Sequence, residues 1–168
     1  LNPILEVKLT EAMTAPLPEE AGGFLGARAL PGITELLQGK SVVAIGPGLG
    51  DHKETAVLMS WIIEASPAPI VIDADGLNLL ARTIGALGRL KVPAVLTPHP
   101  GEMARLTGKT TQQVQADRSG CARELAQKHN VIVVLKGSRT VIAAPHGSIY
   151  INPTGNPGMA SGGMGDAL

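Results

Sequence analysis

Two kinds of hydrophobic pattern alternate along the chain, and each predicts its own kind of element. Short continuous apolar runs rich in Val and Ile indicate buried strands, whereas longer stretches with apolar residues three or four positions apart indicate helices. The short runs predict strands at residues 41–45, 70–73, 94–97 and 131–135. The longer stretches predict helices over residues 52–65, 76–82, 100–105 and 110–129.

Alternating patterns appear nearer the two ends of the chain. Residues 140–144 and 148–151 flank a turn that contains Pro, His and Gly, and this arrangement predicts a β-hairpin. Residues 5–9 alternate apolar and polar side chains, as in a half-exposed strand. Residues 13–31 are expected to form a loop with a short helical piece.

Together these elements predict an α/β fold with a mostly parallel sheet and an antiparallel hairpin at one edge. Apolar residues make up 44% of the chain but aromatic residues only 2%, so the core is built from aliphatic side chains. Open parallel sheets bind ligands beyond the carboxyl ends of their strands. Polar or glycine-rich motifs follow four of the predicted strands, so we expect one crevice formed by residues 46–50, 73–78, 97–102 and 136–140.

Charge and composition argue against several classes of partner. Lys plus Arg and Asp plus Glu both total 14, and this formal net charge of zero comes without a basic block. Together with the scarcity of aromatic residues, it argues against nucleic-acid binding. No apolar run is long enough to cross a bilayer, so we expect no membrane partner. The single cysteine, Cys121, excludes an internal disulfide framework and favours the cytoplasm, and its helical pattern predicts a buried, inert thiol.

The glycine-rich segment at residues 46–50 follows a predicted strand and precedes a predicted helix. Amides of such a loop can approach a phosphate group. The segment is neither a GxGxxG nor a GK[ST] motif, however. Taken alone, it is better interpreted as a tight turn that requires positive φ.

Two carboxylates, Asp73 and Asp75, follow the second predicted strand. Asp75 directly precedes the predicted helix and is expected to cap it. Asp73 remains open between a structural role and contact with a ribose or a hydrated metal ion.

The third predicted strand ends at a proline-bracketed histidine. His99 lies between Pro98 and Pro100, a rigid place to present a side chain, and we expect it to contact a ligand. Glu102 falls in the first turn of the following helix and has two interpretations. It offsets the helix dipole, worth ~0.5 kcal/mol, or it holds a magnesium-bound water near phosphates.

A lysine, a glycine and hydroxyl groups follow the fourth predicted strand. Such a set can surround a phosphate, although a polar turn that opens the hairpin is the alternative. We favour the phosphate because an unpaired charge directly after an apolar run is costly. The segment consists of Lys136, Gly137, Ser138, Arg139 and Thr140.

A second glycine-rich segment near the C-terminal end of the chain carries the sharpest chemical signal. Residues 162–165 read Gly-Gly-Met-Gly and are followed at once by Asp166. A nest of backbone amides at a helix N-terminus stabilises a transferring phosphoryl group. Asp166 is placed to take a proton from an attacking hydroxyl.

Several of these motifs resemble the ADP-dependent NAD(P)H-hydrate dehydratases of the ribokinase-like superfamily. Gly163-Met164-Gly165-Asp166 is similar to the superfamily's GxGD anion hole and base, and residues 99–102 are similar to its NxxE motif, with His99 replacing Asn. Within the superfamily, the stretches most similar to the dehydratases are residues 44–50, 97–102 and 155–166. The resemblance implies a ribokinase-like three-layer α/β/α fold.

The resemblance also implies an activity and a set of site residues. Family members convert NADH hydrate and NADPH hydrate back to NADH and NADPH at the expense of ADP, with release of AMP and phosphate. Asp166 is then the catalytic base, Gly48, His99 and Asp166 contact the hydrate, and Mg²⁺ is held through water near Glu102. The residues expected to contact ADP or AMP are Lys136, Gly137, Ser138, Arg139, Thr140, Gly163 and Gly165.

The similarity spans nearly the whole chain. It implies that residues 1–168 form one incomplete domain, without an N-terminal portion and without the helices after Asp166. Family members are commonly homo-oligomers, such as tetramers, and some are fused or coupled to an NAD(P)H-hydrate epimerase. Two alternatives stay open: a small-molecule kinase of the hydroxymethylpyrimidine type, and a nucleotide-binding module without catalysis. His99 in place of Asn, together with residues 155–158, argues against the kinase.

Overall fold

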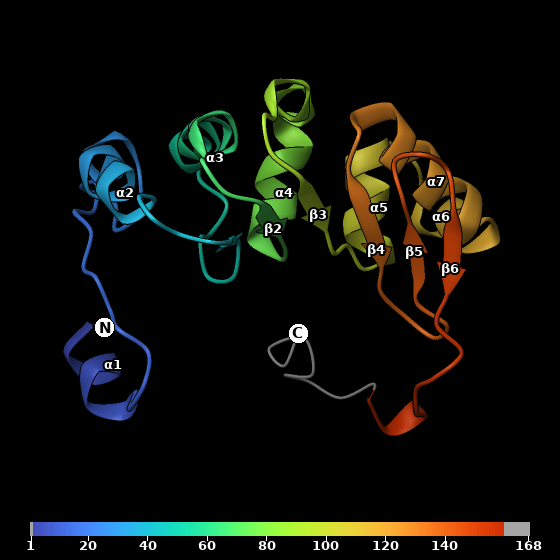
Figure 1. Cartoon of the computed structure of the whole chain (residues 1–168), viewed down its shortest axis with the longest axis horizontal. Helices are drawn as coiled ribbons and strands as arrows, with labels where there is room; N and C mark the ends of the chain where they lie inside the picture. Colours follow the sequence, from blue (N-terminus) through green and yellow to red (C-terminus); the bar gives the residue numbers. More distant parts are fainter. Residues whose placement is uncertain (1, 160–168) are drawn as a thin grey trace.

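A six-stranded mixed sheet forms the centre of the computed structural model, which describes residues 2–159 (Figure 1). The strands lie side by side in chain order. The first four are parallel and the last two antiparallel, so the predicted mostly parallel sheet with a hairpin at one edge is confirmed. Their bounds are β1 (Val43–Ile45), β2 (Ile70–Ile72), β3 (Ala94–Leu96), β4 (Ile132–Leu135), β5 (Val141–Ala143) and β6 (Ile149–Ile151).

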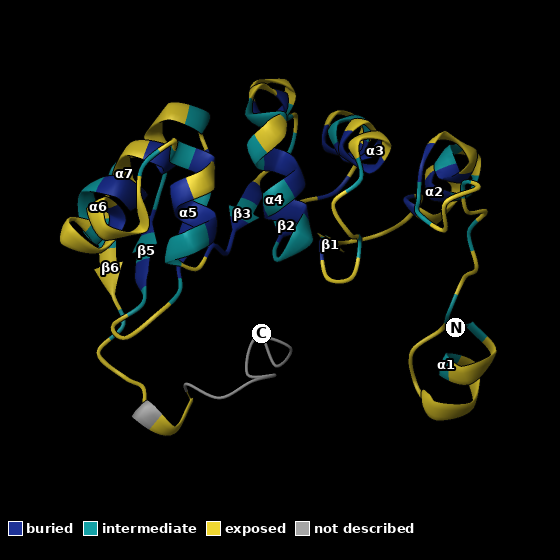
Figure 2. Cartoon of the chain, turned by 180° about the vertical axis from the view of Figure 1, so that it is seen from behind, coloured by how far each residue is buried: buried dark blue, intermediate teal, exposed yellow. Residues whose placement is uncertain are grey.

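Helices connect the parallel strands and lie next to one another along the sheet (Figures 1 and 2). The α-helices are α1 (Asn2–Lys8), α2 (Leu30–Leu36), α3 (Lys53–Ala65), α4 (Asp75–Arg82), α5 (Pro100–Thr107), α6 (Thr111–Ala116) and α7 (Arg118–His129). Within residues 2–159 there are also three short 3₁₀ helices: η1 (Ala27–Ala29), η2 (Ile84–Arg89) and η3 (Pro157–Met159).

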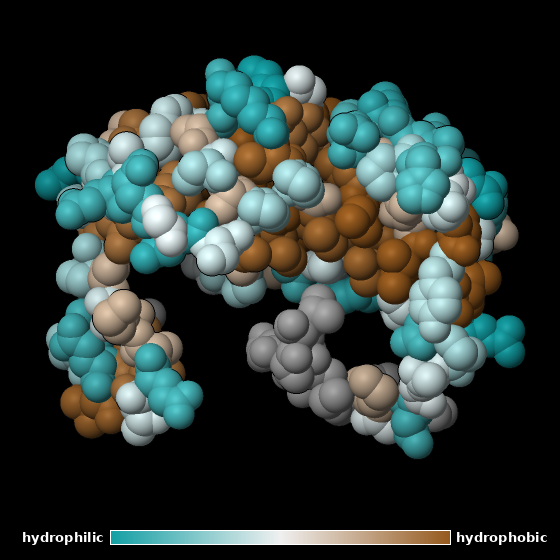
Figure 3. Space-filling model, viewed as in Figure 1, coloured by the Kyte–Doolittle hydropathy of each residue, from teal (hydrophilic) through white to brown (hydrophobic). Residues whose placement is uncertain are grey.

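The main core lies between the sheet and the layer formed by α3, α4, α5 and α7 (Figure 2). Alternate strand residues point into it: Ile70 and Ile72 of β2 are fully buried, whereas Val71 between them is half-buried. Val95 and Val134 share that half-buried face with Val71. The core is aliphatic, as the composition predicts, and apolar side chains also gather over the strands on the face seen in Figure 3.

This architecture confirms the predicted α/β fold with a mostly parallel sheet and an antiparallel hairpin at one edge. Of the three layers that the resemblance implies, the described residues supply the sheet and one helical layer. Within residues 2–159, no helix is both long and apolar enough to span a membrane.

The prediction of a strand at residues 5–9 is wrong, because residues 5–8 belong to the helix α1, which ends at Lys8. The alternation covers only five residues, and Leu, Glu and Lys are good helix formers. No residue of α1 is buried, and the helix stands away from the sheet (Figure 1). No neighbouring strand therefore selects the extended form for this segment.

The prediction of one long helix over residues 110–129 is also wrong, because the segment forms two helices, α6 and α7, that meet at Asp117. Asp117 has φ −141° and ψ 74°, outside the helical range. Its side chain accepts a hydrogen bond from the amide of Gly120 at 2.8 Å and so caps α7. Hydrophobic periodicity continues through such a break, which explains why the pattern conceals it.

Candidate active site

The loop at residues 46–50 joins β1 to α3 at the carboxyl end of the sheet. Gly46, Gly48 and Gly50 all have positive φ, of 143°, 75° and 70°, which confirms the tight-turn interpretation. Gly46 is also a point of close backbone contact, since a Cβ placed there would lie 1.7 Å from the carbonyl oxygen of Asp73. The loop is therefore pressed against the turn that follows β2.

Asp75 does not cap α4, contrary to the prediction. It is the first residue of that helix, and the preceding N-cap residue, Ala74, makes no side-chain cap. Asp75 Oδ2 instead accepts a hydrogen bond from the amide of Gly50 at 2.9 Å. This carboxylate therefore fixes the end of the glycine loop to the start of α4.

The backbone between the two carboxylates adopts a rare conformation. Ala74 has φ 48° and ψ −125°, a region that L-residues seldom occupy. The amide of Gly76 closes the turn by donating to the carbonyl of Asp73 at 3.0 Å. Such strain persists where the surroundings over-determine the backbone, and it is concentrated at functional sites.

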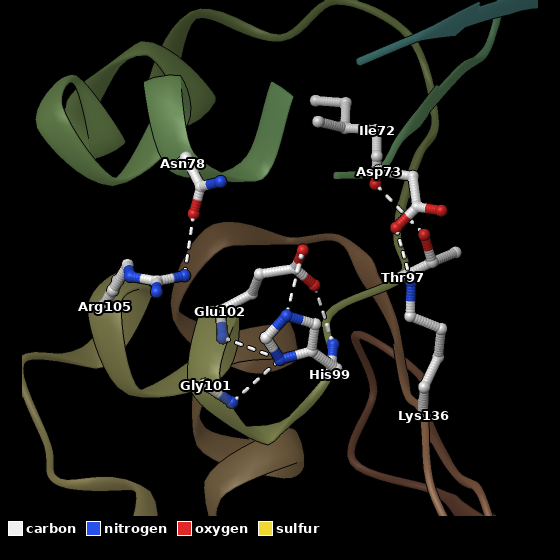
Figure 4. Close-up of polar contacts among 9 residues, drawn as sticks. All are labelled: Ile72, Asp73, Asn78, Thr97, His99, Gly101, Glu102, Arg105 and Lys136. Atoms are coloured by element: carbon white, nitrogen blue, oxygen red, sulfur yellow. Dashed lines mark hydrogen bonds and ion pairs between the residues drawn. The ribbon is translucent and has the colours of Figure 1, made fainter. Parts of the chain in front are cut away.

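Asp73 pairs with Lys136 across β3. Lys136 Nζ donates to Asp73 Oδ1 at 2.6 Å, and the two side chains are only 26% and 17% exposed (Figure 4). Burial alone would raise the pKa of Asp73, but hydrogen bonds from Lys136, from the Ala74 backbone and from Thr97 outweigh it, and the pKa lies below its usual value. The charge of Lys136, which directly follows an apolar run, is therefore paired with the carboxylate of Asp73.

Arg118, which the sequence analysis did not identify, fixes the backbone at the start of the segment 136–140. Its guanidinium donates to the carbonyls of Ser138 at 2.7 Å, Leu135 at 3.0 Å and Lys136 at 3.2 Å. Burial lowers the pKa of Arg118 from its usual value. Carbonyl acceptors for this side chain come from the loop backbone, so residue types alone give no signal for the contact.

The same loop carries its own local restraints. Gly137 has φ 136° and Arg139 φ 54°, and the Thr140 hydroxyl donates to the carbonyl of Gly137 at 3.1 Å. The side chains of Ser138 and Arg139 are exposed.

His99 and Glu102 form a reciprocal cap at the start of α5 (Figure 4). His99 Nδ1 accepts hydrogen bonds from the amides of Gly101 at 3.0 Å and Glu102 at 3.2 Å. Glu102 Oε2 accepts from the amide of His99 at 2.8 Å, and its Oε1 lies 3.3 Å from His99 Nε2. Because Nδ1 accepts, the ring proton lies on Nε2. The His99 side chain is half exposed, whereas that of Glu102 is 6% exposed.

All four motif loops meet at this end of the sheet, as the sequence predicts. Besides the Gly50–Asp75 and Asp73–Lys136 contacts, the amide of Lys136 donates to the carbonyl of Pro98 at 2.8 Å. A further contact ties α5 to α4, where Arg105 Nη1 donates to Asn78 Oδ1 at 2.9 Å (Figure 4). The predicted residues Gly163, Gly165 and Asp166 lie outside the described residues.

Among the residues that the structure describes, no group of three or more His, Cys, Asp or Glu side chains is arranged to hold a metal ion. The two carboxylates considered for metal contact already have partners: the oxygens of Glu102 contact His99, and Asp73 accepts a hydrogen bond from Lys136. A carboxylate offers about four lone-pair sites, so Glu102 can still accept a hydrogen bond from a water molecule while it contacts His99. These contacts with His99 favour a water-mediated contact with a metal ion over direct coordination.

Comparison with protein families gives a match over residues 3–168 to the model described as NAD(P)H-hydrate dehydratase. The chain belongs to the NAD(P)H-hydrate dehydratase family. The resemblance noted in the sequence is thereby confirmed.

Individual relatives of this family agree. The chain is 48% identical over 165 residues to the bifunctional NAD(P)H-hydrate repair enzyme Nnr of Moorella thermoacetica, covering 98% of the chain and 31% of that protein. It is 42% identical over 127 residues to the ADP-dependent (S)-NAD(P)H-hydrate dehydratase of Neisseria meningitidis, covering 74% of the chain and 43% of that protein. The chain thus spans less than half of the length of these curated relatives.

Solved structures of the family and superfamily share the fold. The ADP/ATP-dependent NAD(P)H-hydrate dehydratase of Bacillus subtilis, co-crystallised with ATP/Mg2+, is 37% identical with a TM-score of 0.63, over 75% of this chain and 43% of that one. A ribokinase-like superfamily protein of Enterococcus faecalis is 28% identical with a TM-score of 0.67, over 84% of this chain and 49% of that one.

Proposed function

We propose that the protein repairs hydrated nicotinamide cofactors by ADP-dependent dehydration of NADH hydrate and NADPH hydrate. The family match over residues 3–168 is the observation that carries this proposal. The meeting of four loops at the carboxyl end of a parallel sheet supports it, because this is where such sheets bind ligands.

The nucleotide is assigned to the loop after β4. Lys136 brings an ammonium group with three N–H donors, of which Asp73 takes one. Gly137, Ser138, Arg139 and Thr140 complete this side of the site, with Arg118 fixing their backbone. Gly163 and Gly165 are proposed to supply amides to the transferring phosphoryl group.

The hydrated dinucleotide is assigned to the opposite side of the crevice. Gly48 is exposed in the β1–α3 loop, and a Cβ added there would meet nothing within 4 Å, so a ligand can approach its backbone. His99 presents a half-exposed ring with its proton on Nε2. Asp166 is proposed to contact the hydroxyl of the hydrate as the catalytic base.

The proposed reaction follows the logic of a kinase. Asp166 removes the proton of the ring hydroxyl, the oxygen attacks the β-phosphorus of ADP, and AMP leaves. The ring nitrogen then donates its electron pair and the phosphate departs with the former hydroxyl oxygen. Loss of a proton from the neighbouring ring carbon restores the reduced nicotinamide.

Mg²⁺ is proposed as the cofactor. When bound, it would neutralise charge on the phosphates, and Glu102 would orient one of its water ligands. Association of subunits into a homo-oligomer and coupling to an epimerase domain, as in the bifunctional relatives, are further proposals of the same kind.

The decisive experiment incubates the full-length protein with enzymatically hydrated NADH and ADP and follows absorbance in the NADH band. Recovery of the band together with stoichiometric AMP supports the dehydratase. Asp166→Asn is expected to abolish recovery while ADP binding persists, because the amide cannot accept the proton. Absence of recovery by a folded, ADP-binding wild type would refute the proposal.

A further inference from the structure

The turn at residues 73–75 stands between the two proposed ligand sites and contacts both. Asp75 Oδ2 holds the amide of Gly50 at 2.9 Å, at the end of the loop assigned to the dinucleotide. Asp73 Oδ1 holds Lys136 Nζ at 2.6 Å, at the start of the loop assigned to the nucleotide. The carboxylates of Asp73 and Asp75, which are separated only by Ala74, thus contact two different loops.

The turn is also rigid. The positive φ of Ala74 and the Asp73–Gly76 hydrogen bond fix its backbone. Gly46 packs directly on it, with no room for a Cβ against the carbonyl of Asp73, and a Cβ on Gly76 would lie 3.0 Å from Gly46 Cα. A displacement of the turn therefore moves the 46–50 loop with it.

We propose that the 73–75 turn couples the two sites, so that ADP and the dinucleotide each strengthen binding of the other. This inference rests on the proposed function, which assigns the ligands. A phosphate that takes a free N–H of Lys136 shares the ammonium with Asp73 and shifts that carboxylate. The rigid turn carries the shift to Asp75 and to the amide of Gly50.

Coupling of this kind is reciprocal: the factor by which ADP tightens dinucleotide binding equals the factor by which the dinucleotide tightens ADP binding. A turn that merely holds the fold together would behave differently. Its loss would weaken both ligands or lower stability, but the coupling factor would stay the same.

The test measures the Kd of ADP for the full-length protein by calorimetry, with and without saturating NADPH as the unreactive probe. For the wild type we expect NADPH to lower the Kd of ADP about fivefold or more. Asp73→Asn and Asp75→Ala should each bring this ratio close to one. Asp51→Asn is the matched control, because this neighbouring carboxylate pairs with Arg82 on the surface and should leave the ratio intact.

Several outcomes would overturn the inference. One is a wild-type ratio of one, which needs no variant to fold. Another is an unchanged ratio in either turn variant, with folding checked by circular dichroism. Turnover of hydrated NADH separates this inference from the proposed function. If the protein turns over hydrated NADH but NADPH leaves the Kd of ADP unchanged, only the proposed coupling is refuted. If NADPH lowers the Kd of ADP but hydrated NADH is not turned over, only the proposed dehydratase activity is refuted. Binding of neither ligand overturns both.

Discussion

At the scale of single residues, the candidate site depends on two backbone positions where a side chain decides stability. Gly46 has no room for a Cβ, which would sit 1.7 Å from the carbonyl oxygen of Asp73. Ala74 next to that carbonyl carries a Cβ at φ 48°, where glycine is favoured. The first position forbids a methyl group, and the second tolerates one under strain.

Gly46→Ala is expected to reduce the free energy of unfolding by about 3 kcal/mol or more, since strain and overpacking add together. Gly108→Ala is the control, because Gly108 has φ 69° but nothing within 4 Å of its added Cβ. That variant should lose only about 1 kcal/mol. Urea unfolding of both variants measures the difference, and equal losses would contradict the close contact.

Ala74→Gly is expected to raise the free energy of unfolding, in contrast to Gly46→Ala. Relief of the strained φ and ψ offsets the extra entropy of glycine in the unfolded chain, so the variant is expected to be up to about 1 kcal/mol more stable than wild type. Ala81→Gly, inside α4, lacks that relief and should lose about 1 kcal/mol. Thermal unfolding in parallel tests the contrast, which disappears if Ala74 is unstrained.

At this scale the sequence predicts the backbone conformation of single residues better than it predicts which residues their side chains contact. The positive φ of the glycines at residues 46–50 follows from their lack of a Cβ. The partner of Asp75, by contrast, is a backbone amide 25 residues away, and that of Asp73 is a lysine 63 residues away. Nothing local in a sequence encodes such contacts, so the local cap was the natural but wrong prediction for Asp75.

At the scale of secondary-structure elements, caps decide where helices begin. The imidazole of His99 caps α5 by accepting from two amides, a task that Asn, Asp, Ser or Thr more often performs. Family resemblance places Asn at this position in the wider superfamily. Asn is itself a preferred N-cap residue, so an Asn side chain at position 99 is expected to take over the capping role of the imidazole.

His99→Asn is thus expected to keep the free energy of unfolding within about 0.5 kcal/mol of wild type, whereas His99→Ala should lose about 1 kcal/mol. Chemical denaturation checks both values. Any loss of turnover in the stable Asn variant then reports ligand contact rather than unfolding. A large loss of stability in His99→Asn would show that the ring does more than cap.

Asp117 gives a second test of a cap, at the break between α6 and α7. Asp117→Ala leaves the amide of Gly120 without its acceptor and should cost about 1 kcal/mol. Asp117→Asn keeps an oxygen in place and should cost only a few tenths of that. If both variants match the wild type in urea, the two helices are joined without help from this side chain.

Element prediction succeeded where packing and pattern agree. Strands β2, β3 and β4 are continuous apolar runs, and alternate residues of each strand are buried in the core under the helices. It failed for α1, which buries nothing, and at Asp117, where one side chain interrupts a periodic stretch. In both cases the deciding interaction is weak or local compared with the hydrophobic signal.

At the scale of the whole molecule, the sequence predicted a mostly parallel sheet with connecting helices and the edge of the sheet where the motif loops meet, since both follow from strand–helix alternation. The connections between loops arise only when the sheet assembles, because β3 separates β2 from β4 in the sheet and yet Asp73 and Lys136 meet across it. These long-range polar contacts also make the stability of the whole fold depend on pH.

We expect the free energy of unfolding to fall in two steps as the solution is acidified. Burial, aided by the charge of Lys128, lowers the pKa of His129 below its usual 6.5, so the unfolded chain takes up this proton first and stability falls below that pH. The pKa of Asp73 is lowered below its usual 3.8, so its contribution is complete above that pH and is lost as the pH falls through the folded value.

Urea unfolding as a function of pH measures both steps. His129→Gln should remove the first step, and Asp73→Asn should reduce the second, because each variant deletes the group that titrates differently in the two states. Substitution of the exposed His146 by Gln serves as the control and should retain both. A first step that survives in His129→Gln would assign it to another group and would show that burial at the end of α7 does not oppose protonation.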